Sequence, residues 1–264
     1  MKPRHPLGIV SISFRPLAPR DLLARAAAAG LECIEWGSDA HAPPRLPDGE
    51  SRDAALERLS TLARATREAG LAVSSYGTYF RLGATPPGDF PALLEAARAL
   101  GAPILRVWAG ARGFSEMDGA ERAGLLRAAR EATARAADAG IVLCLECHPN
   151  TATDCPEGSA FLLEGVPGLA TYWQPNPFHD EAWNLAHLRL VAPRVKIAHV
   201  FHWIADETRT VRRHPLAEGT GPWTRYLADL PPAVPLLLEF MPDDSPDSLP
   251  REAGALRTLS TCRP

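Results

Sequence analysis

The feature that most constrains the fold is an eightfold alternation between short apolar segments and longer helix-forming segments. Most of the apolar segments are continuous runs, which is typical of parallel strands covered by helices on their faces. We predict strands at Leu7–Phe14, Leu31–Trp36, Leu71–Tyr76, Pro103–Trp108, Ile141–Glu146, Ala170–Gln174, Val195–Phe201 and Val234–Phe240.

The segments between these strands predict helices at Arg20–Ala29, Ser51–Ala69, Phe90–Leu100, Gly119–Ala139, Asp180–Leu190, Trp223–Leu230 and Pro250–Leu259. Gly70, Gly101 and Gly140 end three of them, because glycine readily adopts the left-handed conformation that closes a helix. With no long linker or low-complexity tract, residues 1–264 are predicted to form one α/β domain, a (β/α)8 TIM barrel with a closed eight-stranded parallel sheet. A doubly wound open sheet is the alternative.

Composition narrows the functional classes. No apolar run approaches the ~20 residues of a membrane span, and no signal-like segment follows the basic N-terminus, so we expect a cytoplasmic protein without a membrane partner. The net charge of −3 and the dispersed arginines argue against nucleic-acid binding. Five cysteines do not suggest a disulfide framework. Cys144 and Cys147 would point to opposite faces of a strand, so we predict buried thiols there.

Polar residues close the last four predicted strands, at the end of a barrel where active sites lie. Glu146 ends the fifth, Gln174 ends the sixth, His199 lies in the seventh, and Glu239 follows three leucines in the eighth. Each alone has a structural explanation. Together, two buried carboxylates would repel one another unless a cation lay between them. We therefore predict that the four side chains bind one divalent metal, Mn²⁺, Mg²⁺ or Zn²⁺.

Several stretches along the whole chain resemble the xylose-isomerase-like barrel superfamily, in its group of sugar phosphate isomerases and epimerases. The matching stretches are residues 34–41, 75–79, 106–110, 145–151, 172–176, 199–203 and 238–240.

The resemblance implies a metal shell of Glu, Asp, His and Glu on strands five to eight. Glu146, His199 and Glu239 match this pattern, whereas Gln174 stands where Asp is usual. An amide oxygen can coordinate a cation but carries no charge, so we expect weaker metal binding. A shifted register would instead place Asn176 at this position, followed by His179.

The resemblance also implies a reaction: isomerisation or epimerisation of a small sugar, sugar phosphate or hydroxy-carbonyl compound through an enediolate. Glu146 and Glu239 would be the catalytic residues that remove and return a proton. Substrate contacts are expected from residues near other strand ends, each of which also has a structural explanation: Glu35, His41, Trp108, His148, Asn150, His202 and Arg213.

Three other functions share this fold. A metal-dependent lyase of the inosose dehydratase type differs only in the fate of the enediolate. A non-catalytic sugar-binding barrel is favoured by the change to Gln174. An abasic-site endonuclease needs three metals and a basic face, which the sequence does not show. The resemblance further suggests a homo-oligomer.

Overall fold

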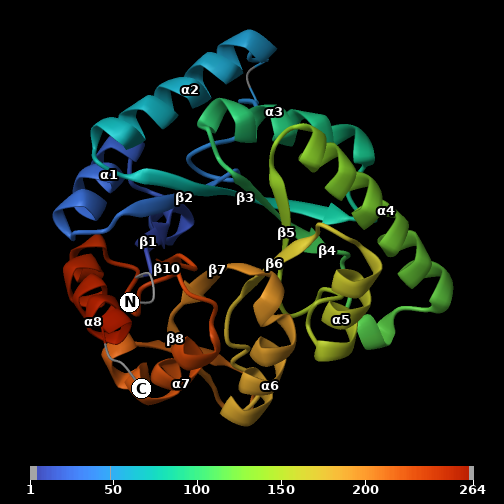
Figure 1. Cartoon of the computed structure of the whole chain (residues 1–264). Coiled ribbons are helices and arrows are strands. Elements are labelled where there is room, and N and C mark those ends of the chain that lie inside the picture. Colours follow the sequence, from blue (N-terminus) through green and yellow to red (C-terminus); the bar gives the residue numbers. More distant parts are fainter. Residues whose placement is uncertain (1–4, 48, 262–264) are drawn as a thin grey trace.

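The computed structural model describes residues 5–47 and 49–261, and its parallel strands close into a barrel (Figure 1). The strand order around the barrel is β1-β10-β7-β6-β5-β4-β3-β2. Because β1 pairs with both β2 and β10, the sheet has no free edge, which confirms the predicted barrel and excludes the open sheet. The strands are β1 (Leu7–Val10), β2 (Cys33–Gly37), β3 (Ala72–Leu82), β4 (Ile104–Ala109), β5 (Val142–Glu146), β6 (Ala170–Trp173), β7 (Val195–Val200) and β10 (Leu236–Leu238).

Helices form the layer around this barrel (Figure 1). They are α1 (Pro19–Ala28), α2 (Arg52–Glu68), α3 (Phe90–Leu100), α4 (Gly119–Asp138), α5 (Pro156–Gly165), α6 (Glu181–Val191), α7 (Thr220–Asp229) and α8 (Leu249–Thr261). Ser51, Asp118 and Asp180 cap three of them by accepting backbone N–H groups of the first turn. Over the ranges that the structure describes, no helix has the length and apolar character needed to cross a bilayer.

The buried apolar residues form two clusters. The larger one lies between the strands and the helices. The smaller one fills the barrel interior and consists of Val10, Ile12, Cys33, Cys144, Ala170, Tyr172, Ile197 and Leu237. Cys144 therefore packs inside the barrel, while the Cys147 thiol lies 3.4 Å from the Thr171 hydroxyl. Both are buried free thiols, as predicted.

Two elements depart from the sequence prediction. Helix α5 was missed, because Gly158 and Gly165 weaken its helical pattern; Gly158 is required there, since a Cβ would lie 1.8 Å from the Ala152 carbonyl oxygen. An antiparallel hairpin, β8 (His202–Ala205) with β9 (Val211–His214), was also missed. It follows β7 directly, so its first strand looks like a continuation of the barrel strand in the sequence.

Some strand ends also differ. The first strand stops at Val10, and Ser11–Phe14 form a 3-10 turn. The third runs on to Leu82. The sixth and eighth stop at Trp173 and Leu238, so that Gln174 and Glu239 are the first residues beyond them.

Candidate metal centre

The alternation of side chains along the strands places polar residues inside the barrel. Five residues of the interior cluster are each followed, two positions later, by a polar residue. The interior residues are Cys33, Cys144, Tyr172, Ile197 and Leu237, and the polar residues, in the same order, are Glu35, Glu146, Gln174, His199 and Glu239. Because side chains two apart on a strand share a face, the polar residues form the next layer toward the C-terminal ends of the strands. All five are buried.

The structure brings the four predicted ligands together around the Nδ1 atom of His199. This atom lies 3.1 Å from Oε1 of Gln174, 3.5 Å from Oε1 of Glu239 and 3.6 Å from Oε1 of Glu146. Ligand atoms of Glu146, His199 and Glu239 all lie within 4.8 Å of one another. One nitrogen and three oxygens thus converge on a common point.

The structure distinguishes between the two registers considered for the sixth strand. Asn176 faces its own loop, where its side-chain oxygen accepts the backbone N–H of Phe178 at 3.0 Å. His179 stacks on Trp183 with 3.9 Å between ring centroids. Gln174 is therefore the residue that faces the centre.

A buried arginine, which the sequence reasoning missed, joins this layer from β4. Arg106 is 2% exposed, and its Nη1 lies 2.7 Å from Oε2 of Glu146. Its Nη2 lies 3.4 Å from Oε1 of Glu35. The available signal was a basic residue at an inward position of an apolar strand, Ile-Leu-Arg-Val-Trp at 104–108, because an arginine is seldom buried without partners.

Within this cluster, neighbouring charges shift the pKa values of three residues in the direction opposite to the effect of burial. Burial alone would raise the pKa of Glu35, but the nearby His199 imidazole and the charge of Arg106 lower it to about 2. The pKa of Glu146 falls well below its usual range, because Arg106 and His199 outweigh its burial. Burial alone would lower the pKa of His199, but the charge of Glu239 and the nearby carboxylates of Glu146 and Glu35 raise it to about 10.

Glu239 behaves in the opposite way to the other two glutamates. Burial raises its pKa, and the nearby charge of Glu146 adds to this rise, although His199 and Arg106 act against it. Its carboxylate lies 3.5 Å from Nδ1 of His199. An added positive charge nearby would lower this pKa and favour the carboxylate form of Glu239.

The donor set fits a divalent cation. Three carboxylates (Glu35, Glu146 and Glu239) and one guanidinium (Arg106) leave two negative charges when His199 is neutral, as an imidazole ligand must be. A divalent ion would balance these charges. Carboxylate and amide oxygens with one imidazole nitrogen are ligands that Mg²⁺, Mn²⁺ and Zn²⁺ accept.

Comparison with known proteins agrees with this architecture. The family model for the xylose isomerase-like TIM barrel matches residues 23–259. The chain belongs to this family. Comparison with curated proteins by sequence finds no match.

Solved structures with the same fold include members named for different reactions. A probable 3-DHS dehydratase, AsbF, from Bacillus anthracis shares 19% identity with this xylose isomerase-like barrel at a TM-score of 0.75, over 97% of this chain and 99% of that one. A D-psicose 3-epimerase with D-tagatose from Clostridium cellulolyticum H10 shares 14% sequence identity with this chain. The TM-score is 0.67, and the alignment covers 99% of this chain and 100% of that one. A xylose isomerase-like TIM barrel protein from Mycobacterium smegmatis in complex with magnesium shares 16% sequence identity with this chain. The TM-score is 0.67, and the alignment covers 97% of both chains.

Aromatic side chains form one wall beside the centre of this xylose isomerase-like barrel. The Nε1–H of Trp108 donates to Oε2 of Glu146 at 2.6 Å. The Trp108 ring stacks on His148, with 4.6 Å between centroids, and meets the edge of Tyr79. Trp108 thus fixes the Glu146 carboxylate, whereas the sequence predicted a substrate contact for it. The His148 ring and the Arg81 guanidinium both lie on the Trp108 ring.

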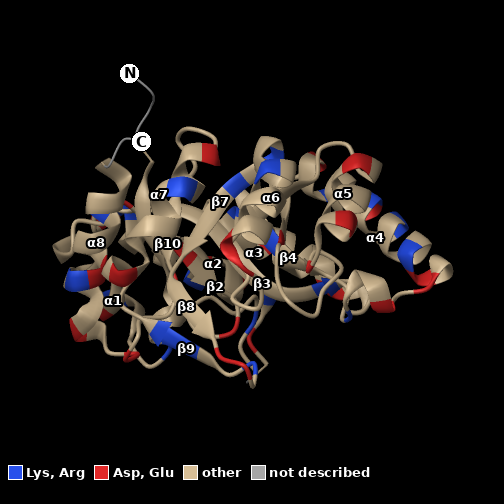
Figure 2. Cartoon of the chain, turned by 90° about the horizontal axis from the view of Figure 1, so that it is seen from below, with Lys and Arg blue, Asp and Glu red and all other residues tan. Residues whose placement is uncertain are grey.

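A pocket of about 330 Å³ adjoins the centre and contains Gln174 in its lining. His148, Asn150 and Arg213 also line it, as do Phe201 and Trp203. Arg213 comes from β9 in the hairpin, whose basic residues are visible in Figure 2. Its guanidinium pairs with Asp244 and lies over the rings of Trp203 and Phe240.

Two of the predicted substrate residues lie elsewhere. His41 packs edge-on against Trp36, and its Nε2 lies 3.0 Å from the Leu17 carbonyl oxygen, in the layer between barrel and helices. His202 pairs in register with His214, and its ring lies against Gly219. Neighbouring residues on a strand face opposite sides, which is why Phe201 and Trp203 line the pocket and His202 does not. Glu35 is in the centre but is fully buried beneath the ligands.

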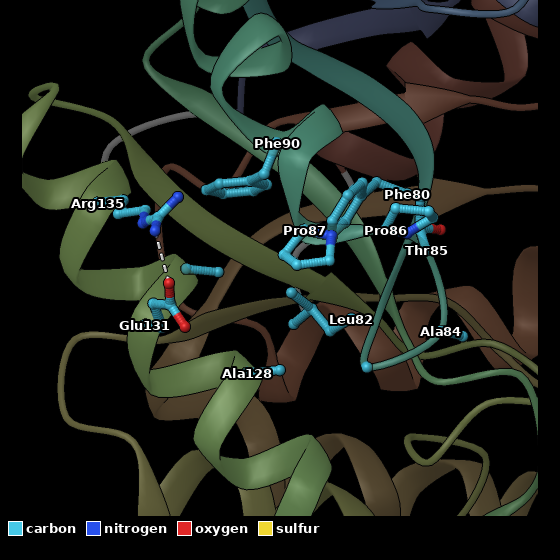
Figure 3. A pocket seen from close by; sticks show the side chains of 12 residues that line it. Phe80, Leu82, Ala84, Thr85, Pro86, Pro87, Phe90, Ala128, Glu131 and Arg135 are labelled. Carbon is cyan, nitrogen blue, oxygen red and sulfur yellow. Dashed lines mark hydrogen bonds and ion pairs between the residues drawn. The ribbon is translucent and has the colours of Figure 1, made fainter.

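A second pocket, of about 390 Å³, opens on the outer face of the barrel between β3, α3 and α4 (Figure 3). Phe80, Pro87 and Phe90 face it. The charged residues in its lining, Glu131 and Arg135, pair with each other at 2.6 Å. It shares no lining residue with the metal centre and offers no free acid, base or ligand group.

Proposed function

We propose that this protein is a divalent-metal-dependent isomerase or epimerase that acts on a small sugar, sugar phosphate or related hydroxy-carbonyl compound. The observation that supports it most is the buried convergence of Glu146, Gln174, His199 and Glu239. These four residues would hold the cation. When bound, it would supply positive charge that stabilises the oxyanion developing on a carbonyl substrate.

The two ligand glutamates would supply the base and the acid of the reaction. Arg106 and Trp108 both contact Oε2 of Glu146, so this carboxylate stays ionised and accepts the proton from the carbon next to the carbonyl. Glu239, the second carboxylate at the centre, would return a proton to the resulting enediolate. Phe201 and Trp203 line the adjoining pocket and would provide the apolar face against which the carbon chain of the substrate packs.

A second candidate is a lyase, which the likeness to a probable dehydratase favours. The first step would be the same proton removal by Glu146. The hydroxyl on the next carbon would then leave with a proton as water, and a carbon–carbon double bond would form.

The test is to incubate the purified protein with ketohexoses, their phosphates and inososes in D₂O, before and after chelation. An epimerase or isomerase exchanges the hydrogen next to the carbonyl for deuterium, which NMR detects, whereas a dehydratase forms an alkene that absorbs in the ultraviolet. We expect chelation, or Glu239→Gln, to abolish turnover and metal addition to restore the wild type.

A matched control is Glu252→Gln, because Glu252 is equally buried but accepts the backbone N–H of Leu216 outside the barrel. Turnover that survives both chelation and Glu239→Gln would contradict the proposal. Sugar binding without turnover in any of these assays would support the non-catalytic binding protein instead.

A further inference from the structure

The geometry beneath the ligands points to a further residue: we propose that Glu35 is a positioning residue for the metal centre, which holds the Nε2–H side of His199 so that Nδ1 faces the cation. The assignment rests on the metal centre proposed above, but not on any particular substrate or reaction. It replaces the substrate contact expected of Glu35 from the sequence.

The imidazole of His199 has two different surroundings. Its Nδ1 faces the ligand oxygens of Gln174, Glu239 and Glu146. Its Nε2 is buried, has no hydrogen-bond partner in the part of the chain that the structure describes, and lies 3.7 Å from Oε1 of Glu35. That distance exceeds the upper limit of a good N–H···O hydrogen bond, about 3.2 Å, by about 0.5 Å, which a rotation of the ring would close.

A metal-bound imidazole has one nitrogen on the metal and its proton on the other. In most metal sites the second nitrogen donates to a carboxylate or carbonyl, which fixes the tautomer and the plane of the ring. With Nδ1 facing the ligands, Nε2 must carry the proton, and Glu35 is the carboxylate that faces it.

Glu35 is itself held in place from two sides. The Ser75 hydroxyl donates to its Oε2 at 2.8 Å, and Nη2 of Arg106 lies 3.4 Å from its Oε1. The backbone of β3 passes so close that a Cβ on Gly77 would lie 2.4 Å from Oε1 of Glu35 and 2.8 Å from Nη2 of Arg106. Only a glycine leaves room for this ion pair.

Arg106 extends the same arrangement to a second ligand. Its Nη1 reaches Oε2 of Glu146 and also donates to the Thr78 carbonyl oxygen at 3.2 Å. Oε1 of Glu146 is the oxygen that remains toward His199. Glu35 and Arg106 thus orient His199 and Glu146, one ligand each, from below the centre.

The experiment compares Zn²⁺ binding by the wild type, Glu35→Gln and Glu35→Asp, with Glu252→Gln as the control for losing a buried, paired glutamate. Affinity is measured by competition with a chromophoric chelator. In parallel, protein labelled with ¹⁵N-histidine and loaded with diamagnetic Zn²⁺ reports the Nε2–H resonance of His199, assigned by its loss in His199→Gln.

We expect Glu35→Gln to weaken Zn²⁺ binding by about 10- to 100-fold, and the Nε2–H signal to shift upfield and exchange faster with water. Glu35→Asp, which keeps the charge but retracts the carboxylate, should lie between, and Glu252→Gln should bind Zn²⁺ like the wild type. If Glu35→Gln does not fold, the Zn²⁺ affinity of Glu35→Asp and the Nε2–H signal of the wild type test the assignment instead.

Unchanged affinity and an unchanged Nε2–H signal in the Glu35 variants would overturn the assignment, as would equal weakening by Glu252→Gln. Because these readouts need no substrate, a protein that fails the turnover assay but behaves as expected here would refute the proposed reaction while leaving the role of Glu35 intact.

Discussion

Replacing Arg106 by methionine tests whether the buried charges form one balanced cluster. Methionine occupies most of the same volume but removes the guanidinium between Glu35 and Glu146, 3.4 and 2.7 Å away. Removing one partner of a buried ion pair costs about 3–5 kcal/mol, because the remaining charge stays buried without compensation. For a chain of this size, where 1 kcal/mol shifts Tm by about 2–4 °C, Tm should fall by roughly 6–20 °C.

The charge count makes a second, more specific prediction for the same variant. Without Arg106 the three carboxylates leave three negative charges, so a divalent cation should stabilise Arg106→Met more than it stabilises the wild type. Thermal unfolding followed by circular dichroism, with a chelator and with saturating Mg²⁺, measures both effects. Arg189→Met is the control, since Arg189 makes a solvent-exposed pair with Asp229 worth at most about 1 kcal/mol. A Tm loss no larger than that of the control would refute the charge-cluster reasoning.

Three further predictions concern the centre itself. Gln174→Glu restores a carboxylate at the position next to His199 Nδ1, so calorimetry should show Mg²⁺ binding at least tenfold tighter; weaker binding would mean that Gln174 is no ligand. The pKa of His199 is raised to about 10, so the imidazole must lose a proton to bind the metal, and Zn²⁺ affinity should rise as pH increases from 7 toward 10. Calorimetry in buffers of different ionisation enthalpy should show about one proton released per Zn²⁺ bound. Zn²⁺ binding that does not depend on pH would contradict this. Trp108→Phe removes the 2.6 Å hydrogen bond to Glu146 but keeps an aromatic ring, so turnover should fall about tenfold or more with little change in KM. A change in KM alone would indicate a substrate contact only.

The barrel could be predicted from the sequence because its signals are local. Continuous apolar strands and helices ended by glycine repeat through the chain, and strand-end polar residues share one end of a closed barrel. Gln174 and Glu239 could be identified in this way although their strands end one residue earlier than expected.

Other features depend on contacts between distant segments and could not be predicted from local pattern. Arg106 differs in the sequence only as a basic residue within an apolar strand, and its partners Glu35 and Glu146 lie on two other strands. His41 and His202 resemble pocket residues by their nearness to strand ends, but the direction of each side chain depends on the register of a turn and of the β8–β9 hairpin. Helix α5 was obscured by Gly158, which tertiary packing requires.

The most direct measurement is a crystal of the protein grown with Mn²⁺, with diffraction recorded on both sides of the manganese absorption edge. One anomalous peak is expected at the barrel mouth, within about 2.0–2.6 Å of the carboxylates of Glu146 and Glu239, the amide oxygen of Gln174 and Nδ1 of His199. An absent peak at saturating Mn²⁺, or a peak that these four side chains do not contact, would contradict the existence of the metal centre.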